Sequence, residues 1–213
     1  MPTLTEGIPI AGEGTTPSID DFDGFLAAAT LLQQPRLARS YVYICYYGPT
    51  TVQELIDTLD VARATAYDDV EQLETLSLVE RDESTRPHEL TAESFAFVDQ
   101  DQLAITPTVL HAVALTEIDD DLAYFQNRYG IGRLTQALRL AGKHYAGQLT
   151  QRQIAEELGV APAEGMAVVQ ALRPALAAGQ KFDPYFDRLF PDISDEVDVD
   201  IEHVQPRSDW TDE

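Results

Sequence analysis

The chain has 213 residues, of which 44% are hydrophobic, so it can bury a sizeable core as one large domain or two small ones. Its 37 acidic residues against 14 basic ones give a formal net charge of −23, and its single cysteine excludes an internal disulfide and a thiolate-based zinc site. No apolar run approaches the ~20 residues of a membrane span, and the first residues lack the basic and apolar regions of a secretory signal. We therefore expect a cytoplasmic protein that does not bind membranes.

The acidic residues are spread along the whole chain, and only two of the basic residues are lysines. This composition resembles that of proteins from extreme halophiles, above all haloarchaea, in which carboxylates hold water and cations in concentrated salt. At ~1 M salt the Debye length falls to ~3 Å, so repulsion between the chain and a phosphate-bearing partner is screened. The charge therefore does not exclude a nucleic-acid-binding function.

The N-terminal half predicts a series of helices followed by a β-hairpin. Residues 1–17 are rich in Gly, Thr and Pro without periodicity, which predicts a flexible arm. The helices follow from apolar spacing and stop signals, and the hairpin from apolar positions on both sides of a polar turn. We expect helices over about 22–32 (with Phe22, Phe25, Ala29 and Leu32 on its apolar face), 36–47, 51–59 and 62–76, hairpin strands over 78–82 and 89–98, and a third strand over 103–105.

Helix, helix, tight turn, helix and hairpin is the order of elements in a winged helix-turn-helix. The segment TVQELIDTLDVARATAYDDVEQLETLSLVERD resembles the DNA-binding core of ArsR- and MarR-type regulators. The residues that carry this resemblance are Thr51, Ala62, Thr65, Leu73, Leu78, Val79 and Arg81. The resemblance covers roughly residues 35–100 and implies that the protein binds double-stranded DNA.

The outward face of the predicted recognition helix supplies the candidate DNA contacts. At about 100° per residue, Ala66, Val70 and Leu73 point inward, and a recognition helix reads bases with its N-terminal turns. The candidates are Arg63, Thr65, Tyr67 and Asp68 on the helix, and Arg81, Arg86 and His88 on the wing. Asp68, Asp69 and Glu71 put carboxylates where many such regulators carry Arg or Gln; a carboxylate can accept a hydrogen bond from cytosine N4, or hold a cation against phosphate.

Shifted by 99 residues, the chain aligns on itself without a gap, so residues 134–172 predict a second three-helix unit. The positions that correspond to the candidate DNA contacts carry Pro162, Glu164, Met166 and Ala167. Pro174 should end or kink the helix, and no wing pattern follows it. We interpret its apolar side as a core or a dimer interface, with Met166, Val168 and Val169 as the interface candidates. Arg152 and Gln153 are the candidates for a second DNA contact.

The predicted fold is mainly α with a small β-hairpin wing: a winged helix-turn-helix followed by a helical domain that contains a second, degenerate helix-turn-helix-like unit. The expected organisation is a flexible arm (1–17), a winged helix-turn-helix domain (18–106), a helical C-terminal domain (107–190) and an acidic disordered tail (191–213). Residues 108–178 predict helices broken at Gly130, Gly147 and Gly159, and the aromatic segment 182–190 should pack on them.

Other conspicuous residues favour structural roles. The tyrosines around Cys45 predict core packing rather than a redox or ligand sensor, the four histidines are too dispersed for a local metal site, and Asp119-Asp120-Asp121 suits the first turn of a helix. Phosphate-binding loops, nucleotide-binding glycine patterns and nucleophile elbows are absent. We therefore expect no catalytic residues, no metal, no cofactor and no enzymatic activity.

The sequence predicts a sequence-specific DNA-binding transcriptional regulator that acts as a homodimer and is adapted to high salt. The alternative is a protein–protein interaction module built on degenerate winged helices that do not bind DNA. RNA binding has no module signature in the sequence.

Overall fold

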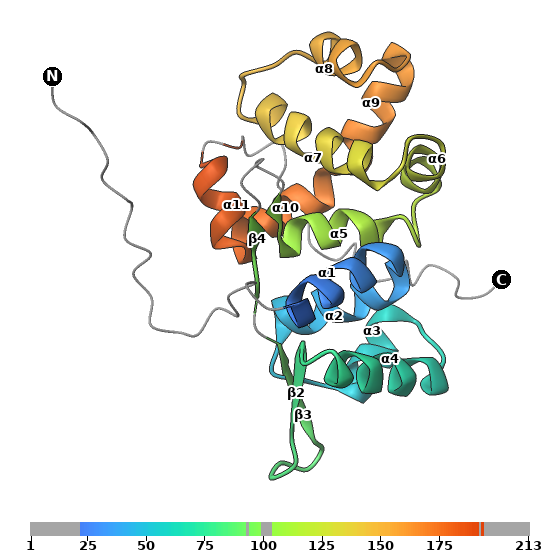
Figure 1. Ribbon diagram of the computed structural model, residues 1–213, viewed down its shortest axis with the longest axis vertical. Helices are drawn as coiled ribbons and strands as arrows, with labels where there is room; N and C mark the ends of the chain where they lie inside the picture. Colours follow the sequence, from blue (N-terminus) through green and yellow to red (C-terminus); the bar gives the residue numbers. More distant parts are fainter. Residues whose placement is uncertain (1–21, 93, 99–103, 192, 194–213) are drawn as a thin grey trace, which may run out of the picture.

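The computed structural model describes residues 22–92, 94–98, 104–191 and 193, so the expected arm and nearly all of the expected acidic tail lie outside the described residues. Helices dominate, and the strands form two small antiparallel sheets, which confirms the predicted fold class. Figure 1 shows a winged unit with α1–α4 at one end, a helical unit with α6–α9 at the other, and α5, α10 and α11 between them. Over the described ranges, none of the helices has the length and apolar character needed to cross a membrane.

The winged unit follows the predicted order of elements. It comprises α1 (Phe22–Gln33), α2 (Pro35–Tyr47), β1 (Thr50–Thr51), α3 (Val52–Leu59), α4 (Arg63–Thr75), β2 (Val79–Asp82) and β3 (Glu89–Ala92). Its antiparallel sheet has the order β1-β3-β2, with Leu90 of β3 opposite both Thr50 and Arg81. The sequence did not predict β1, because two residues that lead directly into a helix leave no alternating pattern.

The second strand of the predicted hairpin is shorter than expected. Strand β3 ends at Ala92, and the following apolar residues form β4 (Phe97–Val98), which pairs with β5 (Ala104–Ile105) in a separate two-stranded sheet. The third strand therefore exists but joins β4 rather than the wing, and its first expected residue, Leu103, lies outside the described residues. Alternation of apolar residues marks extended chain without identifying its partner strand.

The core of the winged unit is built from the predicted faces of α3 and α4. Val52, Leu55 and Leu59 of α3 are buried, as are Ala66, Val70 and Leu73 of α4. The face predicted for α1 was wrong in part: Phe25 is 52% exposed, whereas Ala27, Ala28 and Leu31 are buried. Helix α1 is apolar on nearly all sides, so its pattern did not define which side packs against α2 and α5.

The helical unit with α6–α9, the second unit, repeats the winged unit at a spacing of 99 residues. It contains α6 (Asp120–Tyr129), α7 (Ile131–Tyr145), α8 (Gln151–Leu158) and α9 (Pro162–Ala171). Thr51 and Thr150 both open their helices with a capping box, closed by Glu54 and Gln153 respectively. Both helices end at a left-handed residue, and the next helices begin from Ala62 (φ −60°, ψ 142°) and Ala161 (φ −62°, ψ 144°). The repeat is therefore structural as well as sequential.

No strand follows α9 among the described residues; α10 (Arg173–Phe182) and α11 (Pro184–Leu189) follow instead. Pro174 lies in the first turn of α10, where its missing N–H costs no hydrogen bond. The helical region is also broken after α5 (Pro107–Leu115), at a place without glycine that lies just before the acidic triplet expected to open a helix. Asp119 caps α6 by accepting a hydrogen bond from the Leu122 amide, which confirms the structural role expected for the acidic triplet.

Aromatic and polar contacts join the winged unit to the middle helices and the middle helices to one another. Tyr46 of α2 stacks on Phe182 of α10, with ring centroids 4.9 Å apart and planes at 17°. The buried carboxylate of Asp183 accepts hydrogen bonds from the amide (3.1 Å) and hydroxyl (2.7 Å) of Thr108 in α5, and caps α11. Phe186 and Phe190 are buried, as expected for this aromatic segment. Helix α5, which packs on α2, α7 and α10, thus holds the winged unit against the rest of the molecule.

Candidate nucleic-acid interface

The first turns of α4 present three of the predicted reading residues together. Arg63 and Tyr67 are exposed, Thr65 is half-buried between them in sequence, and Asp68 is exposed one residue further on. The Arg63 guanidinium lies over the Tyr67 ring, 5.6 Å from its centroid, so the two side chains form one unit. Guanidinium, hydroxyl and phenol groups can all contact phosphates or base edges, which is the chemistry expected of a recognition helix.

Asp69 does not belong to this surface. The prediction that Asp69 lies with Asp68 and Glu71 among the carboxylates facing the DNA is therefore wrong. Its side chain is fully buried and accepts hydrogen bonds from Arg36 (2.9 and 3.2 Å) and from the Ser40 hydroxyl (2.9 Å), both on α2. Asp69 therefore fixes α4 on α2 and cannot hold a cation against phosphate. Sequence reasoning missed Arg36 and Ser40 because they lie 33 and 29 residues away from Asp69 in the chain.

Arg81 lies at the base of the wing and is already bound to a carboxylate. Its guanidinium makes two hydrogen bonds of 2.9 Å to Glu74 of α4, which raise the pKa of Arg81. This fork-to-carboxylate pair ties strand β2 to the C-terminal end of α4. Arg81 therefore has a positioning role that the sequence alone did not indicate.

The wing tip carries Arg86 and His88. The Arg86 guanidinium donates hydrogen bonds to the backbone oxygens of Glu83 (2.8 Å) and Thr85 (2.9 Å) and lies 2.9 Å from Nδ1 of His88. Asp82 opens the turn, and hydrogen bonds from Ser84 lower the pKa of its carboxyl. The two basic side chains are thus held at the tip by the turn itself, where a wing can contact the DNA backbone.

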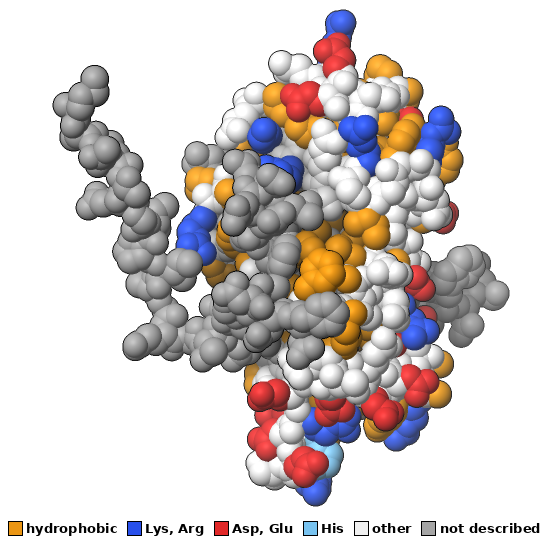
Figure 2. Space-filling model, viewed as in Figure 1, with side chains coloured by type: hydrophobic (Ala, Val, Ile, Leu, Met, Phe, Trp, Pro, Cys, Tyr) orange, Lys and Arg blue, Asp and Glu red, His pale blue; other side chains and the backbone are white. Residues whose placement is uncertain are grey.

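The surface around α4 and the wing mixes both signs of charge. Figure 2 shows Asp and Glu side chains interspersed with Lys and Arg at the lower end of the visible face, where Figure 1 places α4 and the β2–β3 hairpin. Residues 22–92 contain twelve Asp and Glu against five Lys and Arg. The described residues of this unit therefore form no broad basic field, and their positive charges are a few separately positioned arginines.

The equivalent surface of the second unit has a different chemistry. Met166 occupies the position of Tyr67 and is 42% exposed, but Val168 and Val169 are buried in the core of the unit. Of the two roles expected for this apolar side, the two valines take the core role, and Met166 is the exposed residue among the three interface candidates. The side-chain oxygen of Gln153 is used in the capping box, and Nε of Arg152 pairs with Glu156 at 3.0 Å, so both candidates for a second DNA contact already make contacts within α8.

The remaining candidate groups sit in apolar surroundings. Burial raises the pKa of the Cys45 thiol to about 11, which keeps it protonated and unreactive, in agreement with the core role expected for it. Burial lowers the pKa of His111 to about 4, and its ring packs edge-on against Tyr46. Across the ranges that the structure describes, His, Cys, Asp and Glu side chains form no cluster that could hold a metal ion; His203 lies outside them.

Comparison with known proteins gives two matches, one on each side of the break between α5 and α6. Residues 37–113 match the model of the sugar-specific transcriptional regulator TrmB family, and residues 116–181 match the model of a family of unknown function, DUF7437. No curated protein and no solved structure matches the chain. The TrmB match begins in α2, contains α3, α4 and the wing, and ends in α5. Residues 37–113 are therefore similar to the TrmB family of transcriptional regulators, and they fold as a winged helix-turn-helix.

Proposed function

We propose that the protein is a sequence-specific DNA-binding transcriptional regulator that acts as a homodimer in the cytoplasm of a halophilic archaeon. The observation that carries this proposal is the exposed pair of Arg63 and Tyr67 on the first turns of α4, with the half-buried Thr65 between them in sequence, next to a wing with Arg86 and His88 at its tip. In a winged helix these positions face the major groove and the flanking phosphates.

The role of each side chain follows from its chemistry. Arg63 is the side chain suited to a guanine edge, where a good bidentate contact discriminates against the wrong base by about 1–3 kcal/mol. Tyr67 holds the guanidinium over its ring and offers a hydroxyl at the surface. Arg86 and His88 contact the backbone and set the orientation of the wing, whereas Arg81 acts indirectly by fixing the wing to α4.

The family description mentions sugars, but we carry over its transcriptional regulation without its sugar specificity. The matched residues are those of the winged unit, and the C-terminal unit matches a different model whose function is unknown. Homodimerisation is proposed because a winged helix of this kind reads two half-sites when two copies are linked.

Adaptation to salt explains how a chain of net charge −23 can approach DNA. At ~1 M salt the Debye length is ~3 Å, so repulsion from Asp68 and Glu71 reaches only their immediate neighbours. The affinity for DNA should then fall with KCl much less steeply than the ~0.9 logarithmic units per neutralised phosphate typical of basic proteins. A steep loss would instead show that a few arginines dominate a conventional electrostatic interface.

A second function is favoured by the same carboxylates. Asp68 and Glu71 on the exposed side of α4 suit a basic protein partner, which would make the winged unit a docking module that does not bind DNA. Selection of binding sites from random double-stranded DNA in molar KCl decides between the two. The regulator predicts an enriched motif bound at least about 10³-fold more tightly than unrelated DNA; the absence of binding to any DNA sequence would favour the docking module.

A further inference from the structure

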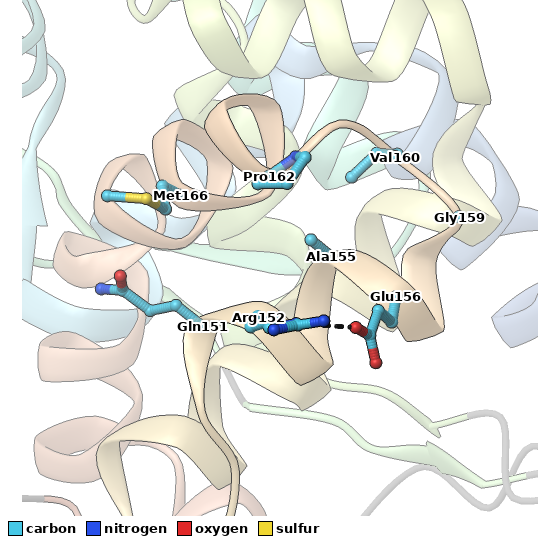
Figure 3. Close-up of a pocket in the computed structure, with 8 residues that line it drawn as sticks. All are labelled: Gln151, Arg152, Ala155, Glu156, Gly159, Val160, Pro162 and Met166. Carbon is cyan, nitrogen blue, oxygen red and sulfur yellow. Dashed lines mark hydrogen bonds and ion pairs between the residues drawn. The ribbon is translucent and has the colours of Figure 1, made fainter.

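The second unit has an open groove where the first unit has its DNA-reading surface. The groove has a volume of about 680 Å³ and lies between α8 and α9. Figure 3 shows Met166 and Gln151 at one end, Gly159 and Val160 at the other, Pro162 on the α9 side, and Arg152 and Glu156 along the α8 side, with Ala155 between the two helices. Its floor is apolar, and its charged groups lie on the rim.

The repeat explains why this groove is open. At the spacing of 99 residues, Ala155 corresponds to Ile56, Pro162 to Arg63, and Met166 to Tyr67. Each residue of the second unit is smaller or less polar than its counterpart, so the groove lies where the first unit carries the larger or more polar side chains of Ile56, Arg63 and Tyr67. The substitutions remove base-reading groups and leave an apolar depression beside an exposed methionine.

We propose that this groove binds a second copy of the chain around a two-fold axis, with Met166 of each copy entering the groove of the other. This inference rests on the homodimer in the proposed function and assigns the surface that forms it. A protruding apolar side chain next to an apolar depression is self-complementary, as a two-fold interface requires. Methionine suits such a contact because its flexible thioether adapts to an irregular cavity.

The rim charges are self-complementary as well. Arg152 and Glu156 are one turn apart on α8, pair at 3.0 Å, and expose 87% and 64% of their side chains. Across a two-fold axis, Arg152 of one copy faces Glu156 of the other and the reverse, so the four charges alternate in sign. An exposed pair within one helix stabilises the fold little by itself, and its outer side stays open to a partner.

Charge distribution along the chain selects this unit as the self-association surface. Residues 104–191 carry eight Lys and Arg against nine Asp and Glu, whereas the whole chain carries 14 against 37. Two copies of a chain with a net charge of −23 repel each other least where they meet through its nearly neutral part. The acidic winged units then lie at the outer ends of the dimer, where two half-sites can be reached.

Two charge variants test the interface in the full chain without DNA. Arg152→Glu and Glu156→Arg each place four like charges across the axis, and we expect each to weaken self-association by more than about 100-fold, because like charges in an interface cost several kcal/mol. An equimolar mixture of the two variants restores both opposite-charge pairs and should dimerise with about the wild-type affinity. Sedimentation velocity at the lowest KCl concentration that supports cooperative melting gives the clearest signal, since screening is weakest there.

Met166 provides a test that is independent of charge pairing. Met166→Asp should produce monomers that melt close to the wild-type temperature, whereas Met166→Leu should remain dimeric. A monomeric wild type, or charge variants and a Met166→Asp variant that dimerise like the wild type, would overturn the proposed surface. The failure of the proposed function is distinguishable: it would appear as absence of DNA specificity, whatever the oligomeric state.

Discussion

The buried carboxylate of Asp69 decides how firmly the recognition helix is seated, and its removal has a calculable cost. Asp69→Ala deletes three hydrogen bonds, two from Arg36 and one from Ser40. The Arg36 side chain is 50% exposed and can be rehydrated, which keeps the cost below the ~3–5 kcal/mol of stranding a buried charge. Ser40 is buried and loses its acceptor, a penalty of ~1–3 kcal/mol. We expect a total loss of roughly 2–4 kcal/mol of unfolding free energy.

The neighbouring Asp68 supplies a matched control, since it is exposed and Asp68→Ala removes the same charge from the same helix. Surface substitutions of this kind change stability by less than ~0.5 kcal/mol. At about 2–4 °C per kcal/mol for a chain of this size, Asp69→Ala should lower Tm by roughly 5–15 °C, and Asp68→Ala should leave it nearly unchanged. Thermal unfolding followed by circular dichroism in molar KCl measures both. Equal melting temperatures for the two variants would refute the clamp between α4 and α2.

Three further predictions concern the fold. Raising KCl from ~0.1 M to ~1 M should increase Tm steeply, because the Debye length falls from ~10 Å to ~3 Å and screens the self-repulsion of the carboxylates; an unchanged Tm would contradict the salt adaptation. Because burial lowers the pKa of His111 to about 4, the unfolded chain binds a proton that the folded chain does not, so roughly 3 kcal/mol of stability is lost as the pH falls from about 6.5 to 4. His111→Leu should flatten the plot of unfolding free energy against pH between about 6.5 and 4. An unchanged slope there would show that other groups cause the loss of stability. Gly179→Ala should lower the unfolding free energy by ~1–3 kcal/mol, because its Cβ would lie 2.5 Å from Oγ1 of Thr108. Gly132→Ala, with open space around the new Cβ, should instead raise the unfolding free energy by up to ~1 kcal/mol. Chemical denaturation of both variants measures the difference.

Local patterns were sufficient to predict most of the winged unit. The apolar spacing in α3 and α4 identified the buried residues, Thr51 marked the helix start, and the alternation around the wing located β2 and β3. The repeat at 99 residues was visible because both capping boxes and both turns are short-range signals. Features that depend on tertiary pairing were not predictable from spacing: the partner of β4, the orientation of the apolar α1, and the two-residue strand β1.

In the candidate site, too, the features set by local spacing were predicted and those set by tertiary packing were not. Helical periodicity placed Arg63, Thr65 and Tyr67 outward, and the structure exposes Arg63 and Tyr67 beside each other. At about 100° per residue Asp69 falls on the side of Ala66 and Leu73 and Asp68 falls away from it, so grouping the two carboxylates overlooked a local signal. Periodicity gave no indication of the partners of Asp69, because Arg36 and Ser40 lie on a helix about thirty residues earlier. For the same reason, the apolar run in α9 did not separate the exposed Met166 from Val168 and Val169, whose burial depends on packing against other helices of the unit.

The measurement that tests the central claim most directly is the affinity of Arg63→Ala for a selected DNA site, compared with Arg188→Ala at the same KCl concentration. Both variants remove one exposed positive charge, but Arg188 lies on α11, far along the chain from the recognition helix. If Arg63 contacts a base, its replacement should weaken binding by about 1–3 kcal/mol, and Arg188→Ala should bind like the wild type. Equal affinities for both variants would show that the N-terminal turns of α4 do not enter the groove.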